Sequence, residues 1–171
     1  MNDGFAVRFM ALTVPVTSRL KSTARVTAVS SGLNIAFGQA DGRLVIGEDE
    51  FKLSSVTGIF EYPYGDIIVS SGDGIYTYRD AEEIRFQEHA TGIESIIGFG
   101  NNAIAIDGMG RAHLLDSKGK SSLLDASSVL FAKLGEKVAI ATEAGQVYTY
   151  SLDGHRDWER PMRGEVGERI T

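Results

Sequence analysis

Residues 70–78, Ser-Ser-Gly-Asp-Gly-Ile-Tyr-Thr-Tyr, join an apolar run at 67–69 to a second run that alternates around two tyrosines. An Asp-Gly pair between two such runs is a strong hairpin signal, because tight hairpin turns need positive φ angles and glycine adopts these freely. Three other stretches repeat this arrangement, and the last glycine of each turn is Gly42, Gly110 or Gly145. Residues 3–7 match the second half of the same unit. The glycines recur about every 35 residues, a spacing typical of repeat proteins.

Each repeat contains four short segments with the alternation of β-strands. The first segments of the four repeats begin at Val26, Val56, Ile93 and Val129. Repeats of four short antiparallel strands are typical of β-propeller blades. A β-sandwich also spaces its strands closely, but it does not explain why residues 75–78 and 147–150 are nearly identical. We therefore predict an all-β protein with the β-propeller fold.

The repeats define a single propeller domain over residues 1–171. We place complete four-stranded blades at 25–54, 55–88, 91–125 and 127–160, a half blade at 1–20 and the start of a further blade at 161–171. Residues 168–171 resemble 24–27, where the first complete repeat opens, so the sequence ends early in another first strand. We expect a fragment of a longer propeller with an incomplete ring. Because open strand edges are templates for pairing, we also expect self-association through the blade edges.

One motif resembles a known class of repeats. In residues 150–158, Tyr-Ser-Leu-Asp-Gly-His-Arg-Asp-Trp, a third strand ends in Leu-Asp and is followed by a glycine turn and Trp158. This order is similar to the repeat of PQQ-like (quinoprotein-type) β-propellers, and residues 115–119 carry its first half. The resemblance implies that Trp158 packs between neighbouring blades. The Gly-His pair at 154–155 and the Asp-Trp pair at 157–158 also contain the residue types that mark WD40 repeats, but in another order and spacing. The resemblance is therefore to the broad PQQ-like/WD40-like class.

The composition narrows the classes of partner. A net charge of −6 and a pI near 5.1 argue against nucleic acid and anionic membranes. The chain has no cysteine, which excludes disulfides and thiolate metal sites. No stretch has the roughly 18–20 apolar residues of a membrane span. The apolar run at 5–16 lacks the basic start and the cleavage site of a signal peptide, so we expect a cytoplasmic protein.

Acidic residues at the glycine hairpins form the first candidate site for a partner. Asp41, Asp73, Asp107 and Glu143 occupy corresponding turns, so we expect them on one face, around the central channel. Such a ring of carboxylates can bind a cation or a basic protein. The alternative, which we favour, is that these residues are simply good turn formers.

Two tyrosines form the second candidate site. Tyr62 and Tyr64 flank Pro63 in the turn after a first strand. Tyrosine is enriched in protein interfaces, so this pair is a candidate for recognition of a partner. Packing against the neighbouring blade is the stronger of the two interpretations.

No set of residues with a catalytic pattern stands out. The histidines His89, His113 and His155 lie in different repeats without the spacing of metal ligands, and no Gly-x-Ser-x-Gly motif is present. We predict no cofactor, no metal and no catalytic residues. The favoured function is a non-catalytic propeller scaffold that binds another protein. The alternative is a part of a PQQ-like propeller enzyme or ligand sensor, dependent on quinone and Ca²⁺, whose site lies in missing blades.

Overall fold

The structure is a computed structural model that describes residues 24–161. The 16 strands of this range form four sheets of four antiparallel strands each, which confirms the predicted β-propeller with four four-stranded blades. The predicted half blade at 1–20 lies outside the described residues, as does the predicted start of a further blade at 161–171, apart from Pro161. The side chain of Trp158 also lies outside them. Residues 24–161 contain no helix that is long and apolar enough to cross a membrane.

The blades are numbered in chain order. Blade 1 contains β1 (Val26–Ser31), β2 (Ile35–Gln39), β3 (Arg43–Ile46) and β4 (Asp49–Lys52). Blade 2 contains β5 (Gly58–Glu61), β6 (Ile67–Ser71), β7 (Gly74–Arg79) and β8 (Glu82–Glu88). Blade 3 contains β9 (Ile93–Phe99), β10 (Asn102–Asp107), β11 (Ala112–Leu115) and β12 (Ser121–Leu123). Blade 4 contains β13 (Val129–Leu134), β14 (Val138–Thr142), β15 (Gln146–Tyr150) and β16 (Arg156–Pro161).

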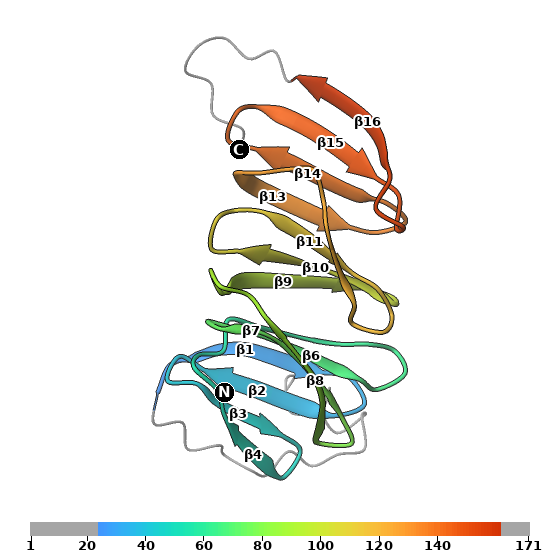
Figure 1. Cartoon of the computed structure of the whole chain (residues 1–171). Helices are drawn as coiled ribbons and strands as arrows, with labels where there is room; N and C mark the ends of the chain where they lie inside the picture. Colours follow the sequence, from blue (N-terminus) through green and yellow to red (C-terminus); the bar gives the residue numbers. More distant parts are fainter. Residues whose placement is uncertain (1–23, 162–171) are drawn as a thin grey trace, which may run out of the picture.

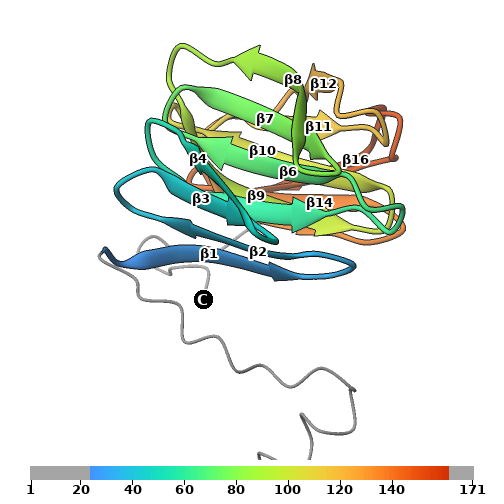
Figure 2. The same ribbon diagram turned by 90° about the horizontal axis from the view of Figure 1, so that it is seen from below.

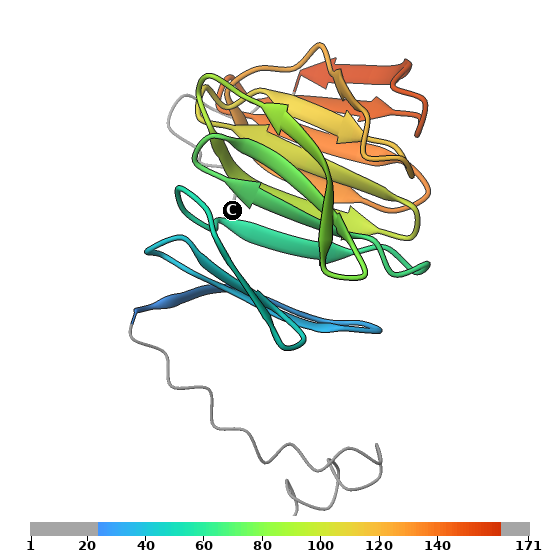
Figure 3. The ribbon, with the colours of Figure 1, turned by 60° about the horizontal axis from the view of Figure 1, so that its bottom comes forward.

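The blades follow one another in chain order, with their sheets packed face to face (Figures 1 and 2). The first strand of each blade is the innermost, since β1 contacts β5, β5 contacts β9 and β9 contacts β13. The fourth strand of each blade lies at the opposite edge of its sheet. Figure 3 shows the same succession from blue to red.

Every blade has two ends that differ in their turns. Because neighbouring strands are antiparallel, the hairpin between the second and third strands lies at one end and the other two turns lie at the opposite end. We call the first the glycine-hairpin end; it contains Gly42, Gly74, Gly110 and Gly145. We call the second the tyrosine end, because it contains Tyr62 and Tyr64.

The apolar core lies between the blades. Successive residues of a strand face the preceding and the following blade in turn, so the middle strands are buried on both faces, and all five residues of β6 are buried. Three apolar clusters fill the spaces between blades 1 and 2, 2 and 3, and 3 and 4. Leu44 and Ile104 are fully buried members of two of these clusters. Truncation of such a side chain to alanine typically costs about 2–5 kcal/mol.

Three of the glycine hairpins share one geometry. Their loops have three residues and end in a glycine in the left-handed region, namely Gly42 (φ 89°), Gly110 (φ 70°) and Gly145 (φ 72°). Each of these glycines donates its N–H to the carbonyl of the residue before the loop, over 3.0, 2.8 and 2.9 Å. Only glycine enters this backbone region without strain, which explains the repeated glycine of the sequence.

Blade 2 departs from this geometry. Ser71 pairs directly with Gly74, so the loop has only two residues, Gly72 and Asp73. Gly74 is in β7 with a φ of 159°, which is nearly extended, and the Asp-Gly pair is not the centre of the turn. Glycine is needed there for space, because a Cβ atom would lie 2.1 Å from the carbonyl oxygen of Gln87. Glycine spacing alone did not distinguish the two kinds of hairpin.

Candidate functional site

The four acidic candidates all lie at the glycine-hairpin end, but their positions do not correspond. Asp41 is the second residue of a three-residue loop, Glu143 is the first residue of such a loop, and Asp107 precedes its loop. Asp73 is the second residue of a two-residue loop. The hairpins also lie one strand outward from the innermost strands. The expected ring of equivalent carboxylates around the channel is therefore wrong.

The position that does correspond is the residue just before each loop. It is polar and buried in all four blades, as Gln39, Ser71, Asp107 and Thr142. In blade 3 the Asp107 carboxylate accepts hydrogen bonds of 2.9 Å from the backbone N–H groups of Met109 and Arg111. Arg111 Nε donates to the same carboxylate over 2.7 Å, and His113 Nε2 lies 3.1 Å from it. This carboxylate therefore holds the hairpin together from inside.

Asp107 remains ionised although it is buried. Burial opposes the charged form, but hydrogen bonds from the Arg111 backbone, the side chains of His113 and Arg111, and the Met109 backbone lower the pKa of Asp107 to about 2. Since none of its surface is exposed, Asp107 is not available to a partner. Asp41 and Glu143, in contrast, are exposed and accessible.

His113 connects this cluster to blade 2. Its ring meets the ring of His89, from the loop after β8, edge-on at a centroid distance of 4.8 Å. Burial, and then the neighbouring His113, lower the pKa of His89. Within the described range of 24–161, no group of three or more His, Asp or Glu side chains is placed to hold a metal ion. The pair is thus a polar contact between blades 2 and 3 at the glycine-hairpin end.

The tyrosines belong to a second contact between the same two blades. Tyr62 is only 1% exposed, and its hydroxyl donates to the carbonyl of Asp116 over 2.7 Å. The ring of Tyr64 stacks on that of Tyr62 at 5.1 Å, and its hydroxyl donates to the carbonyl of Ser117. Packing against the neighbouring blade is therefore the correct interpretation of Tyr62, which leaves the set of partner-binding candidates. Tyr64 is half exposed and stays in it.

Blade 2 holds the whole turn between β11 and β12, residues 116–120, which we call the clamped turn. Besides the two tyrosines, Arg85 Nη1 donates to the carbonyl of Lys118 over 2.5 Å, and Gln87 Nε2 donates to the carbonyl of Gly119. Four successive carbonyl groups of blade 3 thus accept hydrogen bonds from four side chains of blade 2. This contact was not predicted from the sequence, because two polar residues on one strand, Arg85 and Gln87, do not indicate which turn they reach; their partners lie 33 and 32 residues away.

The clamped turn is also fixed from within. Asp116 Oδ1 accepts hydrogen bonds from the backbone N–H groups of Lys118 and Lys120, over 2.8 and 2.9 Å. Gly119 has the left-handed conformation, with a φ of 69°. The turn borders a pocket of about 400 Å³ that is lined by Arg85, Phe86, Gln87, Asp116, Lys118 and Lys120. Three of these six side chains are cations and one is an anion, so the pocket is locally basic.

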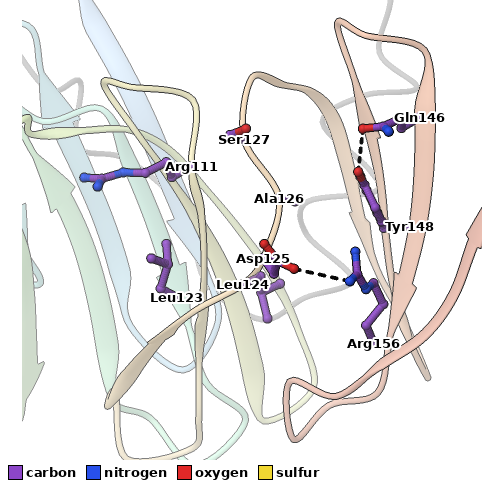
Figure 4. Close-up of a pocket in the computed structure, with 9 residues that line it drawn as sticks. All are labelled: Arg111, Leu123, Leu124, Asp125, Ala126, Ser127, Gln146, Tyr148 and Arg156. Atoms are coloured by element: carbon purple, nitrogen blue, oxygen red, sulfur yellow. Dashed lines mark hydrogen bonds and ion pairs between the residues drawn. The ribbon is translucent and has the colours of Figure 1, made fainter.

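A pocket of about 410 Å³ lies at the junction of blades 3 and 4 (Figure 4). Arg111 and Leu123 line it from blade 3, while Gln146, Tyr148 and Arg156 line it from blade 4, with residues 124–127 between them. Arg156 lies 3.3 Å from the Asp125 carboxylate and 5.5 Å from the centroid of the Tyr148 ring.

The polar groups of this pocket are largely paired with one another. The Tyr148 hydroxyl donates to Gln146 Oε1 over 2.5 Å, and Arg111 is engaged by Asp107. Each arginine therefore has a carboxylate partner, and the pocket has no excess of positive charge. It contains no nucleophile hydrogen-bonded to a general base among the described residues, the arrangement that covalent catalysis uses.

An apolar groove of about 280 Å³ lies at the tyrosine end. It is lined by Gly32, Leu33, Phe60, Glu61, Tyr62, Pro63 and Gly100, which come from blades 1, 2 and 3. Leu33 is 76% exposed and reaches the turn of blade 2 beside Gly65. Phe99, next to Gly100, is 55% exposed. Glu61 Oε1 accepts hydrogen bonds from the backbone N–H groups of Leu33 and Asn34, over 2.8 and 3.1 Å, which fixes the turn of blade 1 at this groove.

Comparisons with solved structures support the fold. The computationally designed Ika4 protein is 17% identical, with a TM-score of 0.65, and the match covers 78% of this chain and 95% of that one. The β-propeller domain of Cps50 (Swd1) from Myceliophteria thermophila is 12% identical, with a TM-score of 0.63, over 83% of this chain and 57% of that one. BBS1N, solved in complex with ARL6DN, is 15% identical, with a TM-score of 0.59, over 80% of this chain and 52% of that one.

These matches show the fold alone. The chain spans about half the length of the Cps50 and BBS1N chains, 57% and 52%. No protein-family model matches the chain, and no curated protein matches it. The β-propeller fold is therefore shared across sequences with little identity, as is common for this architecture.

Proposed function

We propose that this chain is a non-catalytic β-propeller scaffold that binds another protein through the apolar groove at its tyrosine end. The observation that carries the proposal is the apolar lining of this groove, in which Leu33 is 76% exposed beside Phe60 and Pro63. Single exposed apolar side chains are ordinary, but apolar side chains that line one open groove are typical of a protein-binding surface. The occupant we propose is an apolar side chain of a partner protein.

Two further features support this function. The turns that border the groove are held in place by hydrogen bonds between blades, such as those that the backbone N–H groups of Leu33 and Asn34 donate to Glu61. A fixed surface loses little conformational entropy when a partner binds. In addition, BBS1N, which has a similar fold, was solved in complex with the protein ARL6DN.

The proposal includes one element from the sequence, namely that the blades are of the broad PQQ-like/WD40-like class. A second copy of this chain is a further binding partner, through the edges of the blades. Open edges and apolar sheet faces favour such association.

Site-specific photo-crosslinking tests the groove. A photoreactive residue replaces Leu33 or Pro63, which both line the groove, in one pair of variants, and Met109 in a control; Met109 is 62% exposed but lies at the glycine-hairpin end. We expect the same partner protein to crosslink from positions 33 and 63 and not from 109. With that partner purified, Leu33→Glu should weaken binding at least about tenfold, which is 1.4 kcal/mol, and Met109→Glu should not. Equal crosslinking from both ends of the blades, or none from the groove, would contradict the proposal.

A further inference from the structure

We propose that the clamped turn and Arg85 form a binding site for the carboxylate side chains of an acidic segment in the partner protein. This inference rests on the proposed scaffold function and names the chemistry that a second part of the same surface recognises. The site is the pocket of about 400 Å³ at the outer side of the junction between blades 2 and 3.

The charge of this pocket opposes that of the whole chain. The protein has a net charge of −6, yet Arg85, Lys118 and Lys120 line this pocket together. Their one acidic neighbour in the lining is Asp116, and its Oδ1 atom is occupied by two backbone N–H groups of the turn. A local excess of cations on an acidic protein attracts anionic groups and steers them to one place.

The cations are available for a ligand. Among the described residues, the ammonium groups of Lys118 and Lys120 make no hydrogen bond or ion pair with the protein. Arg85 uses Nη1 to hold the carbonyl of Lys118, which orients its guanidinium and leaves its other N–H groups for a ligand. Arginine N–H groups suit carboxylates because the two planar groups match in geometry.

The hydrogen bonds from blade 2 to the clamped turn make this arrangement rigid. The carbonyl groups of residues 116–119 all point to donors of blade 2, so these oxygens do not face an incoming anion. Phe86, which is 42% exposed and packs on Tyr76 at 4.5 Å, adds an apolar surface to the same pocket. The site therefore fits a segment in which acidic and apolar side chains are close together.

The chemistry favours carboxylates over phosphates. Phosphate sites typically use a cradle of backbone N–H groups, but here the N–H groups of Lys118 and Lys120 are already bound by Asp116. The equivalent turn of blade 4 has Asp153 and His155 where blade 3 has Lys118 and Lys120, so the basic character is specific to blade 3.

Fluorescence anisotropy with two labelled peptides tests the site. One peptide alternates glutamate with leucine and the other has glutamine in place of glutamate. We expect the glutamate peptide to bind at least about tenfold more tightly, with affinity falling as salt screens the charges. Lys118→Glu should weaken it at least about tenfold, whereas Lys133→Glu, the same charge change at an exposed site of blade 4, should weaken it less than about twofold. Melting temperatures of both variants would show that they remain folded.

Three results would overturn the inference. Equal binding of the two peptides would show that the site does not recognise carboxylates. Equal losses of affinity in the two variants would show non-specific attraction of the peptide to the whole chain. Inorganic phosphate that displaces the peptide at far lower concentration than acetate would point to a phosphate site. The proposed groove can fail separately: if the peptide binds at the clamped turn but positions 33 and 63 crosslink to no protein, the groove proposal is contradicted and the carboxylate site is not.

Discussion

The junction of blades 2 and 3 and the junction of blades 3 and 4 have the same architecture but are held together differently. At the first, four side chains of blade 2 bind four successive carbonyl groups of the clamped turn. At the second, the equivalent turn, residues 151–155, has the same two backbone hydrogen bonds and a left-handed glycine, Gly154. Among the described residues, no side chain of blade 3 donates a hydrogen bond to that turn.

Two substitutions within the repeat account for two of the four missing donors. Strand pairing places Ser122 and Leu124 of blade 3 where blade 2 has Arg85 and Gln87. The Ser122 hydroxyl donates to the carbonyl of Leu114 in its own blade, and leucine has no donor. Leu124 instead packs in the apolar cluster beside Gly154. The same backbone can therefore carry a polar junction that orders a surface turn or an apolar junction that leaves pockets beside it.

The largest expected effect comes from the glycine-hairpin end of the polar junction. Asp107→Asn should lower the free energy of unfolding by about 2–3 kcal/mol at pH 7, because it removes the charge that several buried donors share. Urea unfolding measures it, and Asp41→Asn, in an exposed loop, is the matched control with an expected effect below about 0.5 kcal/mol. Equal losses in the two variants would show that Asp107 does not organise the junction.

The stability that Asp107 contributes should depend on pH in a defined window. Its pKa is about 2 in the folded protein against an ordinary value of 3.8. As the pH falls below about 4, the unfolded chain takes up the proton first, so this contribution shrinks and is lost near pH 2. Unfolding curves of wild type and Asp107→Asn should therefore converge between pH 4 and pH 2. A constant gap across that range would contradict the ionised state of Asp107.

A double substitution gives blade 2 the residues that blade 3 has at the positions of Arg85 and Gln87. Arg85→Ser with Gln87→Leu removes two donors to the clamped turn, and we expect a loss of about 1–2 kcal/mol. Hydrogen exchange of residues 116–120 should become faster, while exchange of residues 151–155 should stay unchanged. If the two turns responded alike, the loss would reflect general destabilisation of the protein.

The smallest effects distinguish the two tyrosines. Tyr62→Phe removes a buried hydrogen bond and should cost about 1 kcal/mol. Tyr64→Phe removes a bond at a half-exposed ring, where water can replace the partner, and should cost less than about 0.5 kcal/mol. Thermal unfolding compares the two variants. A larger loss of stability in Tyr64→Phe than in Tyr62→Phe would contradict our assignment of Tyr62 as the residue with the buried hydrogen bond.

The sequence predicted the repeat well because the hairpin signals are local. The spacing of Gly42, Gly110 and Gly145 reflects a backbone requirement of each hairpin, and the apolar run of β6 reflects burial on both faces. It failed where one residue changes the loop: Gly74 is spaced like the others but lies in a strand. The acidic residues were misaligned for a different reason: Asp41, Glu143 and Asp107 lie one, two and three residues before the glycine that ends their loop, so Asp107 was grouped with exposed loop positions.

The clamp was beyond prediction from one sequence. Tyr64 binds a carbonyl group 53 residues away in the chain, and the pattern at residues 62–64 suited both an exposed surface and a blade contact. The choice depends on how the turn of blade 3 lies against blade 2. That placement follows from the packing of two sheets and not from any local signal.

Residue-resolved hydrogen exchange of the unmodified protein tests the central claim most directly. We predict that the amide of Gly119, in the clamped turn, exchanges at least about tenfold more slowly than the amide of the equivalent Gly154, because local opening of the first turn must break contacts with blade 2. The two amides make the same backbone hydrogen bond, to the carbonyls of Asp116 and Ser151, so each is the control for the other. Equal rates, or slower exchange at Gly119's counterpart Gly154, would contradict a junction that is ordered by side chains of blade 2.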